Sequence, residues 1–114
     1  MKPALKEKKR YIVFRVHAEE PVPFDALHEA VEQSLLEFLG EERFARAKPK
    51  LIRNLTSQGT GFLQTSPAHV DAVKVGLALI HQIGDTRVIF QTLKVSGTIA
   101  SGKKALPPAR KAAR

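Results

Sequence analysis

A chain of 114 residues, 43% of them hydrophobic, favours a single folded domain and excludes disorder by composition. It has no cysteine, no apolar run near the roughly 20 residues that span a bilayer, and no signal-peptide core after its N-terminus, so we expect a cytoplasmic protein without a membrane partner. The net charge of +8 is concentrated at the two ends, because residues 1–10 hold five basic side chains and one acidic one, and residues 101–114 hold five basic and no acidic ones.

Cationic ends on a nearly neutral body predict three parts: a basic arm at residues 1–9, one domain at residues 10–99 and a basic tail at residues 100–114. Such arms suit contact with a polyanion. RNA or DNA is favoured over a membrane surface, because no cluster of exposed apolar residues accompanies the arms. Tails that only add solubility are the alternative.

The first half of the chain predicts a strand, a helix and a second strand. Residues 10–16 form a β-branched and aromatic run that is typical of a strand. Residues 24–39 carry one apolar stripe at helical spacing, and Gly40 is expected to end that helix. Residues 43–55 predict a basic second strand, which Pro49 makes an edge strand or a bulged one.

The second half predicts a strand, a helix and a last strand. Residues 60–65 form the third strand, and Ser66 and Pro67 are an N-cap followed by a proline at the first helical position. An apolar stripe over residues 70–80 indicates the second helix, which Gly84 is expected to close, and residues 86–95 form the fourth strand. The order βαββαβ predicts an α+β, ferredoxin-like or RRM-like sandwich, with both helices on one face of a four-stranded antiparallel sheet.

Residues suited to catalysis or metal binding are scarce. The four histidines, His17, His28, His69 and His81, have none of the spacings of metal-binding motifs. Residues 59–61 read GTG, which lacks the rest of a dinucleotide fingerprint and is better explained by a hairpin. We therefore expect no catalytic residue and no metal site on this chain.

The sheet face opposite the helices is a candidate binding surface. If Phe14, Leu63 and Phe90 face the helices, strand alternation gathers on the other face Tyr11, Val13, Arg15, Phe62, Arg87 and Ile89. Bases could stack on Tyr11 and Phe62, but the third strand lacks the complete RNP signature, so a protein partner or the chain's own C-terminal segment is the favoured cover. The predicted protein interface is Tyr11, Val13, Phe62, Ile89 and Leu93.

Small residues end the fourth strand just before the basic tail. Ser96, Gly97 and Thr98 offer backbone N–H groups and hydroxyls that suit close approach to phosphate, although their spacing alone favours an ordinary turn in which glycine relaxes the backbone. Together with the cations at both ends and on the second strand, they complete the candidate RNA-binding set: Lys8, Lys9, Arg10, Arg53, Ser96, Gly97, Thr98, Lys103 and Lys104.

Three pieces of the sequence carry a family resemblance: residues 8–14 (KKRYIVF), Gly40 and residues 92–99 (TLKVSGTI). In matching order and spacing, within a similarity over about residues 6 to 100, they resemble the family of archaeal ribonuclease P protein component 2, which has a eukaryotic counterpart shared by ribonuclease P and RNase MRP. The resemblance implies an RNA-recognition-like subunit that supports the catalytic RNA in 5′-end maturation of precursor tRNA. Residues 106–110 depart from the family, because LPPAR is not expected to form the C-terminal helix of some members.

The resemblance also implies partners. In that family the RNA performs the hydrolysis with Mg²⁺ that it binds itself, so no cofactor is expected on this chain. The expected partners are the ribonuclease P RNA, a TIM-barrel-like protein subunit and a second copy of this chain in a heterotetramer, with precursor tRNA contacted indirectly. Two other functions stay open. One is a ferredoxin-like regulatory domain that binds a small ligand, and the other is an independent nuclease, which the missing acid–base set disfavours.

Overall fold

The computed structural model describes residues 8–56 and 59–106. Its strands are β1 (Arg10–Ala18), β2 (Lys50–Leu51), β3 (Thr60–Thr65), β4 (Gln82–Ile83) and β5 (Thr86–Ser96). Its helices are α1 (Phe24–Ala47), α2 (Val70–Ala78) and α3 (Ile99–Lys103), with 3₁₀ turns η1 (Arg53–Leu55) and η2 (Pro67–His69). The α+β class predicted from the sequence is confirmed.

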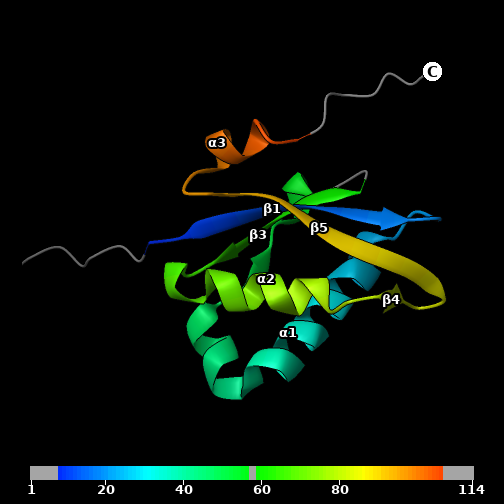
Figure 1. The fold of residues 1–114 in the computed structure, drawn as a ribbon, viewed down its shortest axis with the longest axis horizontal. Coiled ribbons are helices and arrows are strands. Elements are labelled where there is room, and N and C mark those ends of the chain that lie inside the picture. Colours follow the sequence, from blue (N-terminus) through cyan, green and yellow to red (C-terminus); the bar gives the residue numbers. More distant parts are fainter. Residues whose placement is uncertain (1–7, 57–58, 107–114) are drawn as a thin grey trace, which may run out of the picture.

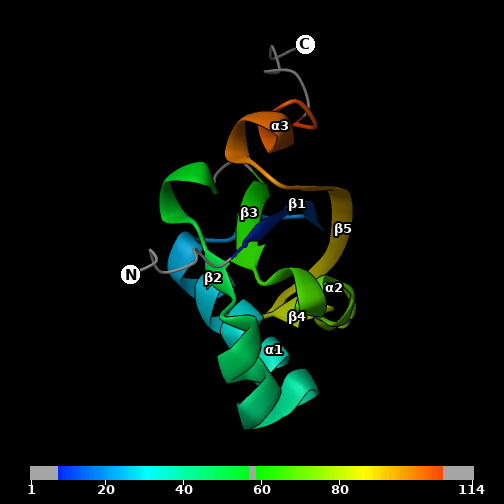
Figure 2. The same cartoon turned by 90° about the vertical axis from the view of Figure 1, so that its left-hand side faces the viewer.

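The five strands form one antiparallel sheet in the order β2-β3-β1-β5-β4. Helices α1 and α2 cover one face, while α3 lies against the other (Figures 1 and 2). The central strand β1 is therefore enclosed on both faces, and Ile12, Val13 and Phe14 are all fully buried. Three consecutive buried apolar residues are typical of a strand that has cover on both sides.

The main core lies between the sheet and helices α1 and α2. Phe14 and Phe90 meet there with ring centroids 5.5 Å apart. The predicted inward set of Phe14, Leu63 and Phe90 is confirmed, because all three belong to this core. The buried side chains that join them include Ile12, Leu27, Val31, Leu35, Leu39, Leu51, Val73, Leu77, Ile80 and Val88.

Gly40 ends a run of helix as predicted, but the strand expected at residues 43–55 is wrong. Gly40 adopts φ 84° and ψ 164°, a conformation that a residue with a Cβ avoids, and a second helical segment follows it up to Ala47. That segment holds its place because Ala47 is buried and its carbonyl accepts hydrogen bonds from the Thr65 hydroxyl and the Ser66 amide. Of residues 43–55, Lys50 and Leu51 form the strand β2, which pairs with β3. This short strand lies at the edge of the sheet, as expected from the presence of Pro49.

The sheet has five strands and not four, because the chain turns once more before β5. Helix α2 ends at Ala78, ahead of the glycine that was expected to close it. Gly84, with φ 61°, instead serves the tight turn that joins β4 to β5. Ile83 of β4 is buried against the core, which explains why this short strand forms.

The C-terminal end of the domain extends past the predicted boundary at residue 99. Residues 99–103 form α3, which packs on β1 and β5. The start of the predicted tail is thus part of the folded domain. Residues 1–7 of the predicted arm and 107–114 of the tail lie outside the described residues.

Candidate nucleic-acid interface

Helix α3 covers the central row of the sheet face that sequence analysis left open. Gly102 lies so close to that face that a Cβ added there would be 2.7 Å from Cε2 of Phe62 and 3.0 Å from Cγ2 of Val13. Phe62 and Val13 are cross-strand partners, and both are fully buried. With α3 in place, the Phe62 ring is not accessible for base stacking, and neither side chain can contact a protein partner.

The other residues of the predicted protein interface have different surroundings. Tyr11 and Leu93 are half-buried, and Ile89 is 67% exposed. The chain's own C-terminal segment is therefore the cover over Val13 and Phe62, as one of the sequence-based alternatives held. Tyr11, Ile89 and Leu93 are left as the accessible part of that prediction.

A short hydrogen-bond network attaches α3 to the end of β5. The Lys94 Nζ donates to Oγ of Ser101 at 3.1 Å and to its carbonyl oxygen at 3.4 Å. The Ser101 amide donates to Oγ1 of Thr98 at 3.1 Å, which is an N-cap on α3. The buried Ser96 hydroxyl donates to the Thr98 carbonyl at 2.6 Å and accepts from the Thr98 amide at 3.1 Å.

Ser96, Gly97 and Thr98 thus form the capping turn of α3. Two of the hydroxyls that were expected near phosphate already have backbone partners, while Gly97 and Thr98 are exposed. Sequence reasoning did not include Lys94 or Gly102. The sheet register shifts between Val13 and Phe14, which pairs Val13 with Lys94 and places Lys94 on the covered face, against simple alternation along β5.

Most of the predicted RNA-binding residues come from segments that follow one another in the fold: the start of β1, the turn after β5, and the C-terminal part of α3 with its C-cap. Antiparallel pairing sets Tyr11 beside Ser96, so the start of β1 lies next to the end of β5 and the turn into α3 (Figure 1). We call this surface the basic end, formed by Lys8, Lys9, Arg10, Ser96, Gly97, Thr98, Lys103 and Lys104. Its four lysines are exposed, and residues 8–10 and 92–106 contain no acidic residue to offset them.

Arg53 is the predicted RNA-binding residue that the fold keeps apart. It begins η1, where its Nη2 donates to Oδ1 of Asp25 at 3.0 Å and its guanidinium lies 4.1 Å from the centre of the Phe24 ring. The ion pair and the cation–π contact attach it to the start of α1. These contacts hold Arg53 beside the start of α1, so it does not belong to the basic end.

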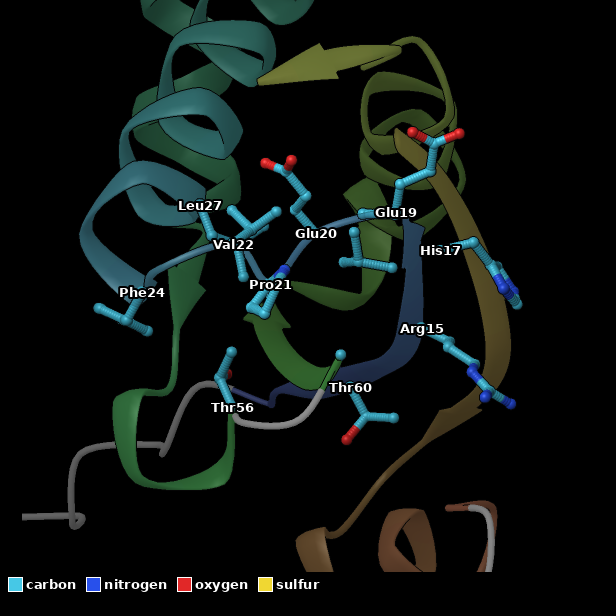
Figure 3. A pocket seen from close by; sticks show the side chains of 13 residues that line it. Arg15, His17, Glu19, Glu20, Pro21, Val22, Phe24, Leu27, Thr56 and Thr60 are labelled. Atoms are coloured by element: carbon cyan, nitrogen blue, oxygen red, sulfur yellow. The ribbon is translucent and has the colours of Figure 1, made fainter. Parts of the chain in front are cut away.

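A cavity of about 730 Å³ opens at the opposite end of β1, between that strand and the start of α1 (Figure 3). Apolar Val22, Phe24 and Leu27 line it together with polar Arg15 and Glu20. In Figure 3 the side chains of Arg15 and Glu20 point in different directions and not toward a common point. A small ligand would have room in this cavity. The polar side chains that line it do not converge on one point, so the cavity gives the small-ligand alternative little support. No group of three or more metal-ligating side chains is found in residues 8–56 and 59–106.

The comparisons with known proteins agree on one family. A model of the Rpp14/Pop5 family matches residues 10–107. This chain belongs to the Rpp14/Pop5 family. Ribonuclease P protein component 2 of Thermococcus kodakarensis is 38% identical over 102 residues, which cover 90% of this chain and 85% of the relative. The proteins of the same name from Pyrococcus furiosus and Archaeoglobus fulgidus are 38% and 35% identical over 90% of this chain, and 85% and 91% of their own lengths are covered.

The fold of this Rpp14/Pop5 family member also matches a solved structure. A chain in the cryo-EM structure of yeast ribonuclease MRP superposes with a TM-score of 0.61, over 84% of this chain and 79% of that one. The two sequences are 7% identical, so this match concerns the fold alone. Within the described ranges, no helix has both the length and the apolar character needed to cross a membrane.

Proposed function

We propose that this chain acts as a protein subunit of ribonuclease P and holds the catalytic RNA through its basic end, in support of 5′-end maturation of precursor tRNA. The observation that carries the RNA contact is a set of cations, its four lysines exposed, on segments that contain no acidic residue: Lys8, Lys9 and Arg10 at the start of β1, which pairs with the end of β5, and Lys103 and Lys104 on α3 and its C-cap. Cations in this arrangement bind phosphates without reading sequence, which suits a subunit that stabilises RNA shape.

The order of the strands supports a finer description of the fold. Strands β2-β3-β1-β5, with α1 and α2 on one face, have the ferredoxin-like order of an RRM-like domain, to which β4 adds an edge strand. In place of an open sheet for base stacking, this domain has α3 over Phe62. RNA binding is thus assigned to the basic end and not to the centre of the sheet.

The remaining partners are proposed on the family relationship. The subunit works in the cytoplasm with the ribonuclease P RNA, which binds the Mg²⁺ and performs the hydrolysis. A TIM-barrel-like protein subunit and a second copy of this chain complete a heterotetramer. Exposed apolar side chains on α1 and α2 support a protein contact on the helical layer: Leu36, Phe38, Val75 and Leu79.

Salt dependence tests the role of the basic end. The full chain with Lys8, Lys9, Lys103 and Lys104 all changed to Gln is added to the assembled ribonuclease P particle that lacks this subunit, and binding is measured at several salt concentrations. Four lost phosphate contacts flatten the log–log salt slope by about 3 units.

The matched control carries Arg46→Gln and Lys74→Gln, on α1 and α2. It removes charge from the helical layer and leaves the basic end intact. An equal flattening per lost charge in the control, or an unchanged slope in the fourfold variant, would contradict the proposal.

A further inference from the structure

Helix α3 covers only part of its sheet face. It lies over the row of Phe62 and Val13, and the face continues uncovered toward the other end of β1. Arg15 pairs there with Gln91, and His17 pairs with Ile89. We call this uncovered surface the bare strip, formed by the exposed side chains of Arg15, His17, Arg87, Ile89 and Gln91.

The bare strip carries positive charge without an internal partner. Neither Arg15 nor Arg87 makes a side-chain hydrogen bond or ion pair with any residue that the structure describes. The one polar contact within the strip joins His17 Nε2 to Oε1 of Gln91 at 2.8 Å, and it fixes both side chains between the two arginines. Acidic Glu19 borders the strip where β1 has ended, and Asp85 precedes β5.

Residues of the bare strip also line two hollows in the surface. A second hollow of about 530 Å³ is lined by His17, Arg87 and Ile89, on the β5 side of the β1 end. Arg15 and His17 also line the larger cavity on the other side of β1, and their side chains extend from the same strand in Figure 3. Ile89, at 67% exposure, offers an apolar surface between these polar groups.

We propose that the bare strip binds the backbone of an RNA strand, with Arg15 and Arg87 on two separate phosphates and Ile89 and His17 against a sugar or base. This inference rests on the proposed function, and it adds a second contact surface at the end of β1 away from the basic end. Arg87 lies about four residues beyond Arg15 in register, roughly 13 Å along the strand, a spacing that lets the two side chains reach separate phosphates of one strand.

The positive charge of the bare strip favours RNA over the two terminal segments of this chain, residues 1–7 and 107–114, as the molecule that covers it. Residues 1–7 and 107–114 each carry more basic than acidic side chains, so a cationic surface repels them. The phosphates of an RNA strand carry the negative charge that can pair with both arginines. Its sugars and bases have apolar faces that can cover Ile89. A protein partner is the competing occupant, and the experiment separates the two.

The test uses the full chain with Arg15→Gln and Arg87→Gln, added to the ribonuclease P particle that lacks this subunit. The loss of two phosphate contacts flattens the log–log salt slope by about 1.4 to 1.8 units. The double change to Lys keeps both charges and is expected to retain the slope. The Arg46→Gln, Lys74→Gln variant serves again as the control, and equal unfolding curves for all four proteins exclude a folding defect.

A photocrosslinking side chain at position 89 then identifies the occupant. Crosslinks to RNA are the expected result, whereas crosslinks to a protein subunit alone, or a salt slope that the Gln variant leaves unchanged, overturn this inference. In both of those cases the wild-type chain still joins the particle through its basic end. A wild-type chain that shows no salt-dependent binding would instead contradict the proposed function itself.

Discussion

At the scale of single residues, α3 depends on the smallest side chain in the protein. Gly102 permits the helix backbone to rest on Phe62 and Val13, both of which are fully buried and closely packed. Any Cβ at this position would meet the Phe62 ring at 2.7 Å, well inside ordinary van der Waals contact. The position of Lys103 and Lys104 is therefore set by a contact between a glycine and an aromatic ring.

Gly102→Ala is expected to lower the free energy of unfolding by about 1 to 3 kcal/mol, because the extra methyl group overpacks a site that cannot yield. Urea unfolding followed by circular dichroism measures the change. Gly97→Ala is the matched control, since nothing lies within 4 Å of a Cβ at Gly97, and its stability should stay within about 0.5 kcal/mol of wild type. Equal stability of the two variants would contradict close packing at Gly102.

The Thr98 hydroxyl caps α3, and its loss should loosen this helix before anything else. Thr98→Val keeps the shape of the side chain but leaves the Ser101 amide without its acceptor, at a cost of about 1 kcal/mol. Hydrogen exchange of the amides in residues 99–106 should become faster, with no change in α1. Thr98→Ser retains the hydroxyl and should exchange like wild type. Faster exchange in both variants would show that the methyl group matters more than the cap.

At the scale of elements, a single backbone angle decides where α1 changes direction. Gly40 has φ 84°, and the helical segment after it brings Ala47 against β3, where Thr65 and Ser66 bind its carbonyl. A straight helix would carry Ala47 away from these partners. The kink is thus what allows the second helical segment of α1 to end at the edge of the sheet.

Gly40→Ala is expected to destabilise the fold by about 1 to 3 kcal/mol, although alanine is the better helix former, because the native backbone angles at this position suit glycine almost alone. Thermal unfolding measures the loss. Glu41→Ala, one residue later at an exposed helical position, is the control and should be nearly neutral. A stabilised Gly40→Ala variant would mean that α1 can straighten without losing the contacts of Ala47.

At the scale of the whole molecule, the sheet has two covers of unequal size. Helices α1 and α2 lie on one face, and α3 alone lies over the middle of the other (Figures 1 and 2). Exposed cations remain on that second face, among them Arg15 and Arg87. The basic end includes the C-terminal part of α3 and its C-cap, and the bare strip is the part of the same sheet face that α3 leaves uncovered. An RNA that contacts both would pass along the α3 side of the molecule and leave the helical layer accessible to protein.

Two truncations test how much the second cover contributes. A chain ending at residue 98 lacks α3 and exposes the Phe62 ring, which should lower stability by about 2 to 3 kcal/mol and increase binding of a hydrophobic dye. A chain ending at residue 106 retains α3 and should unfold like the full-length protein. Calorimetry and dye fluorescence compare the three chains. If the shorter chain kept full stability, α3 would not be a structural part of the domain.

Patterns that repeat along the chain could be predicted from the sequence, and single local events could not. Strand alternation located β1, β3 and β5 and the residues that face the helices, because a buried face imposes its period on many positions at once. The helix after Gly40 was missed, since a glycine normally stops a helix and the basic run that follows has no strong period of its own. Strand β4 has two residues, too few for any pattern.

Part of the candidate site could likewise be predicted from the sequence, namely its cations, whereas the contacts of Lys94 and the helix α3 could not. The cations of the basic end are evident in the sequence, but their placement in the fold depends on the pairing of β1 with β5, which the βαββαβ order anticipated. The role of Lys94 was hidden by the register shift beside Val13, which reverses the side that later residues face. Helix α3 is short and contains a glycine, so local propensity gives it little support, and the contact with Phe62, the Thr98 cap and the hydrogen bonds from Lys94 explain it.

The central place of β1 also has a consequence for how the protein forms during synthesis. This strand leaves the ribosome first, yet its two neighbours in the sheet are β3, about fifty residues later, and β5, about eighty residues later. Its backbone N–H and C=O groups therefore wait for β3 on one edge and, for about thirty residues longer, for β5 on the other edge. Pairing over such sequence separations slows folding, and a nascent chain with an unpaired apolar strand is prone to aggregation.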